Sequence, residues 1–551
     1  MNKKLSLYAV SLLLASLMLT LPLQIAYAPP LPWFMKPSFP DYAKSGMPDF
    51  DQRQFGTYPW QYQGAWSHCG PVAVANSLWW LDSEFEVSTT PPPAMVDNYP
   101  LLTSYYAGQC DDHDPANVIP FVEHLAYLMD TDGRRTLIAH LGTNVNDMQA
   151  GITHYLSWSG VNPLGDVDGD GAVTLNDVQI VLNAMGTVPG APGWDMRADI
   201  FPVTTLPAGG KADNVIDPQD LNLVNMNLGL AGKFYEHTLM APDWIMIVNE
   251  VLQCQDVVLL IAPWVWTGSD WYRYSEDAHY VTVAGLNATT MEIVFSNPIT
   301  DNAEAGGPGD VPVPHAHPPL EPPYITHNDA MLVSHDMYPV IMSPCPGGPL
   351  ALPTYSGSIT PPPPGSIWQI EAAVITSPIG IRNIAVTGMT VCYGQTNLAQ
   401  NRTHNINVTV VNQGSIDDVF TLTLYYNSTN ILETTRMLLA AGQTKVVTFH
   451  WHATQKRYKI YALSAVATPV CGETDTADNT YNGPNVKIVW PGDVNGDKKV
   501  DILDVTAITG AYAAVYPSPS YRPNSDIDDS GSLTILDVVL CTGQYGITIP
   551  P

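Results

Sequence analysis

Residues 493–504 read DVNGDKKVDILD, residues 526–537 read DIDDSGSLTILD, and the earlier residues 166–177 read DVDGDGAVTLND. Each stretch places side-chain oxygens at positions 1, 3, 5, 9 and 12 of a twelve-residue loop. A calcium ion takes six to eight oxygen ligands, and this spacing supplies them from one tight loop. We therefore expect three calcium sites, whose side-chain ligands are Asp166, Asp168, Asp170, Thr174 and Asp177 in the first loop, Asp493, Asn495, Asp497, Asp501 and Asp504 in the second, and Asp526, Asp528, Ser530, Thr534 and Asp537 in the third.

An apolar stretch with helical spacing follows each loop. Two features distinguish these units from EF-hands: position 12 is Asp in place of Glu, and a helix lies on just one side of each loop. They resemble dockerin type I repeats, and residues 490–551 hold the two units of such a module. The resemblance implies calcium binding and a cohesin-like partner, which we expect to meet apolar positions at Ile508 and at 538–540. The alternative is that the module only ties the C terminus against the domain before it.

Residues 165–232 carry the first loop and form an inserted dockerin-like segment. Its second unit, from Asp199 to Asp220, is less regular, so a second calcium loop and a polar turn that caps a helix are both open. The segment lies between a predicted amphipathic helix at 144–156 and a predicted strand at 234–240. Such connections lie on the surface, where inserted modules cost little stability.

Short alternating stretches such as 406–412 and 420–425 are separated by turn residues over residues 380–489. This pattern predicts an antiparallel β-sandwich. With Asn412-Gln-Gly414 and Phe449-His-Trp451, the region resembles a CARDB domain, an adhesion-related sandwich of exported prokaryotic proteins.

The chain of 551 residues is long enough for several domains, and 22 Lys+Arg against 52 Asp+Glu give a formal charge of −30. Nucleic acid is not expected as a partner, because phosphates need the opposite charge. Residues 1–28 combine a basic start with a long apolar stretch, which predicts a secretory signal, with a membrane anchor as the alternative. We expect a secreted or cell-surface protein, and four N-x-S/T sequons are compatible with glycosylation, at Asn287, Asn401, Asn407 and Asn427.

The seven cysteines are an odd number. In an oxidising compartment we expect six to pair and Cys69 alone to remain a thiol. The alternative is that Cys541, in the C-terminal helical module, also remains a thiol. Cys392 and Cys471 lie near the first and last strands of the predicted sandwich, and we expect them to form a disulfide.

Residues 61–81 read QYQGAWSHCGPVAVANSLWWL. Gly70-Pro71 followed by an Ala-rich apolar run predicts the start of a helix, so Cys69 lies at the positive end of the helix dipole. We expect this position to lower the pKa of the Cys69 thiol, which is a common way to activate a cysteine nucleophile. His68 is adjacent in sequence, and we expect it to be a bystander.

A strand–turn–strand pattern spans residues 278–297. A hairpin centred on Ala288 places His279 directly opposite Asn297, whose amide would orient the imidazole. Gln63, six residues before the thiol, is the candidate oxyanion donor. The chain thus supplies a thiol, a base, an orienting amide and an oxyanion donor.

This arrangement resembles the papain-like cysteine peptidases, and within them the double-glycine-leader peptidases, with their Q-x5-C-G-P start and late H-x-V-x-V-x-G. Asn297-Pro298 stands where those peptidases have Asp-Pro, and Asn is the papain choice. The resemblance implies an α+β papain-like domain formed by residues 29–164 and 233–378. It also implies these roles: nucleophile for Cys69, general base and acid for His279, orienter for Asn297 and oxyanion donor for Gln63.

The expected reaction is hydrolysis of a peptide or protein substrate through an acyl-enzyme. Acyl transfer would use the same residues. The rival hypothesis is a non-catalytic cell-surface adhesin or scaffold that binds peptides or glycans.

Overall fold

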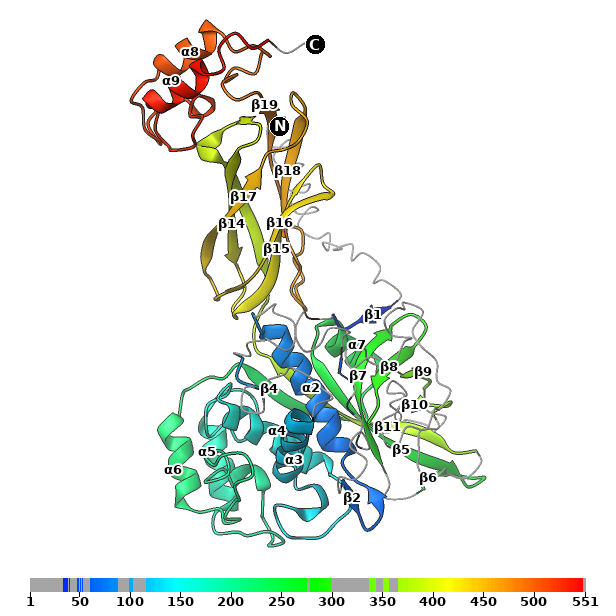
Figure 1. Ribbon diagram of the computed structural model, residues 1–551. Coiled ribbons are helices and arrows are strands. Elements are labelled where there is room, and N and C mark those ends of the chain that lie inside the picture. Colours follow the sequence, from blue (N-terminus) through cyan, green and yellow to red (C-terminus); the bar gives the residue numbers. More distant parts are fainter. Residues whose placement is uncertain are drawn as a thin grey trace, which may run out of the picture.

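The computed structural model describes residues 33–37, 39, 47–48, 50, 52, 60–87, 99–102, 115–274, 278–298, 336–342, 350–355 and 365–548. The predicted signal at 1–28, together with Cys110 and Cys345, lies outside these residues. Figure 1 shows three bodies in succession: an α+β body with its insert, a β-sandwich, and a small helical module. No helix in the described part of the chain is long and apolar enough to cross a membrane.

An antiparallel sheet forms the centre of the first body, in the order β10-β11-β5-β7-β8-β9. β5 and β7 are buried almost throughout, as strands covered on both faces are. Three further strands pair at the sides: β4 with β11, β1 with β7 and β6 with β5. The strands are β1 (Phe34–Met35), β4 (Phe234–Met240), β5 (Asp256–Trp266), β6 (Trp271–Arg273), β7 (His279–Asn287), β8 (Glu292–Ser296), β9 (Asp336–Pro339), β10 (Ala351–Leu352) and β11 (Ile367–Pro378).

Helices cover both faces of this sheet. α2 (Cys69–Phe85) is buried along its whole length, because it lies between β7 and the helices α3 (Pro115–Leu128) and α4 (Val145–Ser159). Alternate residues of β5 face this core, whereas the others face a second core that α7 (Trp244–Leu252) covers. The sheet and α2 therefore form one rigid frame.

The insert lies between α4 and β4, and both flanking elements are where the sequence predicts them. Its helices α5 (Leu175–Ala184) and α6 (Pro218–Asn227) pack together around a small core of their own. Figure 1 shows them at the outer side of the first body.

The sandwich packs a three-stranded sheet, β12-β14-β17, against a five-stranded sheet, β13-β19-β18-β15-β16. The predicted strands at 406–412 and 420–425 are confirmed within β14 and β15. The last module holds α8 (Ile502–Thr509) and α9 (Ile535–Thr542). The sandwich strands are β12 (Ile384–Val391), β13 (Asn397–Ala399), β14 (Thr403–Asn412), β15 (Asp418–Tyr426), β16 (Asn430–Leu439), β17 (Thr444–His452), β18 (Ile460–Ala467) and β19 (Thr480–Val489).

The disulfide differs from the expected one. Cys471 bonds to Cys254, 217 residues away, and so joins the sandwich to the first body. Cys69, Cys392 and Cys541 are buried thiols, so the prediction of a Cys392–Cys471 bond with six paired cysteines is wrong. The loops that carry the bonded pair meet closely, since a Cβ on Gly472 would lie 2.7 Å from the Gln253 carbonyl oxygen. Spacing along the chain does not reveal such a contact.

One of the four sequons is structural. Asn287 is only 3% exposed, and its Oδ1 accepts hydrogen bonds from the N–H groups of Thr289 and Thr290. It therefore closes the β7–β8 turn and is not a glycosylation site in the folded chain. Asn401 and Asn427 are exposed.

Non-reducing peptide mapping of the secreted protein tests the disulfide. We expect a linked pair of peptides containing Cys254 and Cys471, with Cys392 and Cys541 alkylated only after unfolding because both thiols are buried. A linked pair containing Cys392 and Cys471 would contradict the structure.

Candidate active site and calcium loops

Cys69 is the first residue of α2, and His279 is the first residue of β7, the strand against which α2 packs. The backbone N–H of Tyr280, the residue after His279, hydrogen-bonds the Cys69 sulfur. One turn along the helix, the Thr282 hydroxyl donates to the Ala73 carbonyl at 2.7 Å and holds α2 against β7. The predicted helix start at Cys69 is confirmed, and the strand beside it carries the candidate base.

His279 is held by Asn297. The hairpin turns between Asn287 and Glu292, which pair with each other, so its centre lies beyond Ala288. Thr282 therefore pairs with Ser296, and the expectation that Asn297 lies directly opposite His279 is wrong. The side chains still meet, because His279 Nε2 lies 2.7 Å from Asn297 Oδ1.

Tyr355 fixes the direction of that amide. Asn297 Nδ2 donates to the Tyr355 hydroxyl at 3.3 Å, which leaves Oδ1 as the acceptor facing His279. His279 therefore carries its proton on Nε2, and its other ring nitrogen, Nδ1, has the lone pair. Sequence reasoning missed Tyr355, because the Pro-rich stretch around it shows no periodicity.

The pKa of Cys69 is raised to about 11, contrary to the expectation that the helix start would lower it. Burial of the thiol is the largest cause, and it outweighs the opposing backbone N–H groups of Tyr280, Gly70 and Cys69 itself. The resting group is a neutral thiol.

Two glutamines compete for the role of oxyanion donor. Gln63 is exposed at the turn between β2 (Gln61–Tyr62) and β3 (Ala65–Trp66). Gln52 is 1% exposed, and its Oε1 accepts from the N–H of His68, next to the thiol residue. Its own N–H donates to the Pro298 carbonyl, beside the orienting amide. The Gln52 Nε2 group is buried without a hydrogen-bond partner among the described residues. No sequence spacing points to Gln52.

His68 lies beside Cys69 in sequence, but its ring stacks on Trp60 with centroids 5.8 Å apart. Burial lowers the pKa of His68 to about 3, with Arg134 as a second cause, so this imidazole is neutral near pH 7. A neutral imidazole is a weak acid, so His68 is poorly suited to protonate a leaving group.

The three calcium loops share one hydrogen-bond pattern. In each, the closing Asp177, Asp504 or Asp537 accepts from the backbone N–H groups at positions 2 and 3 and caps the following helix. The first carboxylate, from Asp166, Asp493 or Asp526, accepts N–H groups from the middle of its loop. The backbone is thus folded around inward-facing oxygens.

Buried carboxylates gather in these loops. Ligand oxygens of Asp166, Asp168 and Asp177 lie within 4.8 Å of one another, as do those of Asp526, Asp528 and Asp537. Burial first, and then the neighbouring carboxylates, raise the pKa of Asp166 to about 8. Oxygen ligands with shared negative charge fit calcium, which would remove this repulsion.

The second unit of the insert uses an arginine as its cation. Asp220 accepts from the N–H groups of Ile200 and Phe201 as a closing residue does, and Asp199 occupies the first position. Arg135 Nη2 lies 2.9 Å from Asp199 Oδ2, and both side chains are fully buried. A guanidinium from the first body therefore neutralises this loop, which favours the polar-turn alternative over a calcium site.

Comparison with known families identifies the last two bodies. The CARDB family matches residues 385–483, and the dockerin type I domain matches residues 491–542. The chain ends in a CARDB domain followed by a dockerin type I domain. Dockerin type I domains bind calcium and cohesin partners, and both modules are typical of extracellular or cell-surface proteins. Neither module is catalytic.

Solved structures similar to the chain cover about a fifth of it. The CARDB domain of the PF1109 protein from Pyrococcus furiosus, in complex with di-metal ions, is 20% identical and covers 20% of this chain and 90% of its own, with a TM-score of 0.17. A domain of a putative cell surface protein from Methanosarcina acetivorans is 20% identical. It covers 20% of this chain and 93% of its own, with a TM-score of 0.17. A β-glucosidase from Erythrobacter marinus is 13% identical. It covers 20% of this chain and 16% of its own, with a TM-score of 0.16. No curated protein matches the chain.

The exposed apolar side chains of the dockerin domain are only partly where the sequence predicts them, because Val539, within 538–540, is 56% exposed but Ile508 is not exposed. Ile508 is fully buried in the module core, so it cannot face a partner. Ile502 and Leu503 in one unit, and Ile535 and Leu536 in the other, are each 56–58% exposed at equivalent loop positions. We refer to these four exposed side chains, two from each unit, as the paired apolar surface.

Calcium binding should depend on pH differently in the two modules. Protons compete with calcium for Asp166, whose pKa is about 8, and for Asp526, whose pKa is raised only to about 6 because the Tyr521 hydroxyl donates to it. Lowering the pH from 9 to 7 should therefore weaken the insert site about tenfold and the Asp526 site of the dockerin domain by less than about twofold.

Calorimetry on two full-length variants separates the sites. Asp504→Ala with Asp537→Ala leaves the insert loop, whereas Asp177→Ala leaves the dockerin loops. If calcium affinity changed with pH in the same way in both variants, the predicted difference between the insert and dockerin sites would be wrong. If neither variant gave a heat of calcium binding, the assignment of the calcium ligands would be wrong.

Proposed function

We propose that the first body is a cysteine peptidase of the papain-like type, and that the CARDB and dockerin domains place it on an extracellular assembly. The observation that supports this most directly is the Cys69–His279–Asn297 arrangement, in which the thiol begins a buried helix and the imidazole is oriented by an amide. The same three groups, in these roles, carry acyl transfer in papain-like enzymes.

In the proposed reaction, His279 Nδ1 takes the thiol proton as Cys69 sulfur bonds to the carbonyl carbon of a peptide. The imidazolium then gives this proton to the leaving nitrogen as the C–N bond breaks. Water, deprotonated by His279, hydrolyses the thioester and restores the thiol. Because burial raises the pKa of Cys69 to about 11, we propose that the thiol proton passes to His279 as the sulfur attacks.

We assign the oxyanion donor to Gln52 in place of Gln63. The amide is anchored on both sides, by the His68 N–H through Oε1 and by the Pro298 carbonyl through its backbone. An anchored, buried Nε2 can donate to developing negative charge without reorganisation, which is what makes such donors effective. The N–H groups of Cys69 and Gly70, which have no intrahelical carbonyl partner and lie against the Cys69 sulfur, are further candidate donors.

The second candidate is a non-catalytic adhesin or scaffold in which the first body only binds peptides or glycans. The neutral, buried Cys69 thiol favours it, because a thiolate is the nucleophile. The two hypotheses share the assembly role of the dockerin domain, whose paired apolar surface we propose as the contact for a cohesin-like partner.

Substitutions at the three groups test catalysis. On a peptide identified from a cleavage library, we expect Cys69→Ala and His279→Ala to abolish hydrolysis and Asn297→Ala to leave partial activity, because the amide only orients the base. Cys541→Ser, at another buried thiol, is the matched control and should retain full activity. Wild-type turnover by Cys69→Ala would exclude the peptidase, and a folded wild-type protein that cleaves no peptide would favour the adhesin.

The two glutamines give opposite expectations. Gln52→Ala should lower kcat about a hundredfold or more, the usual loss for one oxyanion donor. Gln63→Ala should leave kcat nearly unchanged, because this side chain is exposed at a turn. The reverse result would return the role to Gln63, and steady-state kinetics with circular dichroism of each variant decides between them.

A further inference from the structure

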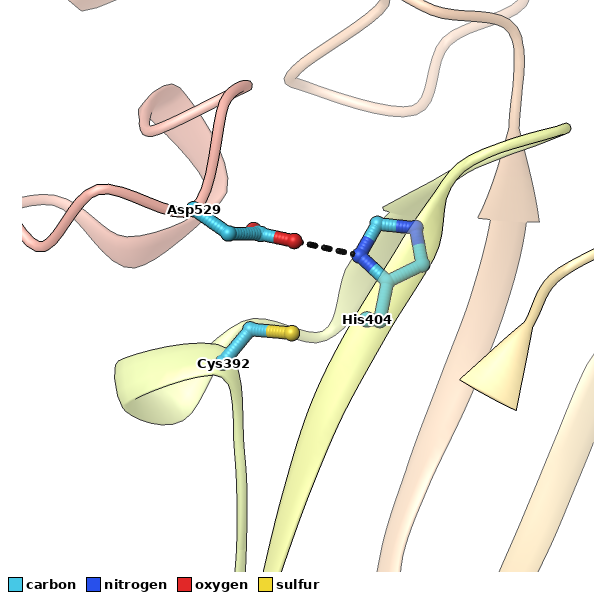
Figure 2. A group of neighbouring side chains, drawn as sticks. All are labelled: Cys392, His404 and Asp529. Atoms are coloured by element: carbon cyan, nitrogen blue, oxygen red, sulfur yellow. Dashed lines mark hydrogen bonds and ion pairs between the residues drawn. The ribbon is translucent and has the colours of Figure 1, made fainter. Parts of the chain in front are cut away.

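Three side chains of different chemistry meet where the CARDB and dockerin domains touch. Cys392 follows β12, His404 lies on β14, and Asp529 projects from the third calcium loop, as Figure 2 shows. A sulfur, a ring nitrogen and a carboxylate oxygen from these residues lie within 4.8 Å of one another. Cys392 is 3% exposed, His404 1%, and the Asp529 side chain 13%.

Both ring nitrogens of His404 face oxygen acceptors. Its Nε2 lies 2.9 Å from the Ala399 carbonyl oxygen, and its Nδ1 lies 2.9 Å from Asp529 Oδ2. A neutral imidazole has a single N–H, so it cannot donate to both oxygens. With one proton, on Nε2, the Nδ1 lone pair faces a carboxylate oxygen. Two positive charges can relieve this contact: a second proton on Nδ1, which makes His404 an imidazolium, or a metal ion bound by Nδ1 and Asp529.

We propose that Cys392, His404 and Asp529 bind a divalent transition metal, Zn²⁺ by its ligand preference, at the CARDB–dockerin junction. Thiolate, imidazole and carboxylate are the ligands that Zn²⁺ takes, at about 2.0–2.3 Å. Tetrahedral ligands at those distances lie roughly 3.3–3.7 Å apart, so small side-chain movements suffice. Water fills the fourth position. Sulfur and nitrogen ligands exclude calcium, which prefers oxygen.

The surroundings of the three ligands match those of a built metal site. A metal-binding histidine usually donates its other N–H to a carbonyl or carboxylate, as His404 Nε2 does to Ala399. Gln395, 3% exposed, donates from Nε2 to Asp529 Oδ1 and to the Asp526 carbonyl, both at 2.6 Å, and so orients the carboxylate.

The site would make the two modules depend on each other. Two ligands come from the sandwich and one from the dockerin domain, so the metal would fix the angle between them. Asp529 is flanked by Asp528, a predicted calcium ligand, which means that calcium in this loop also positions the third zinc ligand. The proposal does not depend on peptidase activity.

Metal titration of the full-length chain tests the site. The parent protein carries Cys69→Ala, which removes the thiol of the candidate active site, and is stripped of metal and returned to saturating Ca²⁺. We expect one equivalent of Co²⁺ to give the thiolate-to-cobalt absorption in the near ultraviolet, and Zn²⁺ to displace it.

Variants of this parent identify the ligands. Cys392→Ser should lose the thiolate absorption and at least about tenfold in Zn²⁺ affinity, whereas Cys541→Ser should match the parent. Asp529→Asn keeps the sandwich intact and should retain the absorption with affinity lowered about tenfold. The proposal is overturned if the parent shows no thiolate absorption or if Cys392→Ser binds Zn²⁺ as tightly as the parent. If Cys392→Ser does not fold, unchanged affinity in Asp529→Asn overturns it.

Discussion

Burial of carboxylates is the constraint on which the rest of this structure depends. The chain has 52 acidic residues and only 22 Lys and Arg, yet several carboxylates are almost fully buried. An uncompensated buried charge costs several kcal/mol, so each needs a cation or several N–H donors. The calcium loops use N–H donors together with a metal, whereas the first body uses its few arginines and lysines.

Arg382 shows how this constraint joins the modules. It follows β11 and contacts Glu84 near the end of α2 and Asp418 at the start of β15. All three side chains are at most 6% exposed, and loss of the arginine would leave two buried carboxylates, a type of loss that costs about 3–5 kcal/mol elsewhere. Because α2 begins with Cys69, the CARDB domain is held against the helix that carries the candidate nucleophile, and it is not a loose tether.

The sequence predicts those features that depend on neighbours along the chain. The loop at 166–177, the helix that begins at Cys69 and the strands of the sandwich follow from local spacing and periodicity, and the structure contains all of them. Contacts between distant segments were not predictable. The Cys254–Cys471 bond spans 217 residues, and Gln52 reaches His68 through tertiary packing alone. The pKa of Cys69 was misjudged for the same reason. The helix dipole follows from the local sequence, whereas burial of the thiol depends on segments that are distant along the chain.

The position of the insert separates its calcium from the candidate chemistry. The Glu236 N–H donates to the Gly169 carbonyl at 2.7 Å, so the first calcium loop is tied to β4. β4 pairs with β11, and β11 and β5 both stand between it and β7, which carries His279. α2 is held to β7 by its own contacts and does not need β4. Calcium bound in the insert would therefore stabilise the sheet edge and leave the positions of Cys69 and His279 to the frame of α2 and β7, which is why an inserted module is tolerated there.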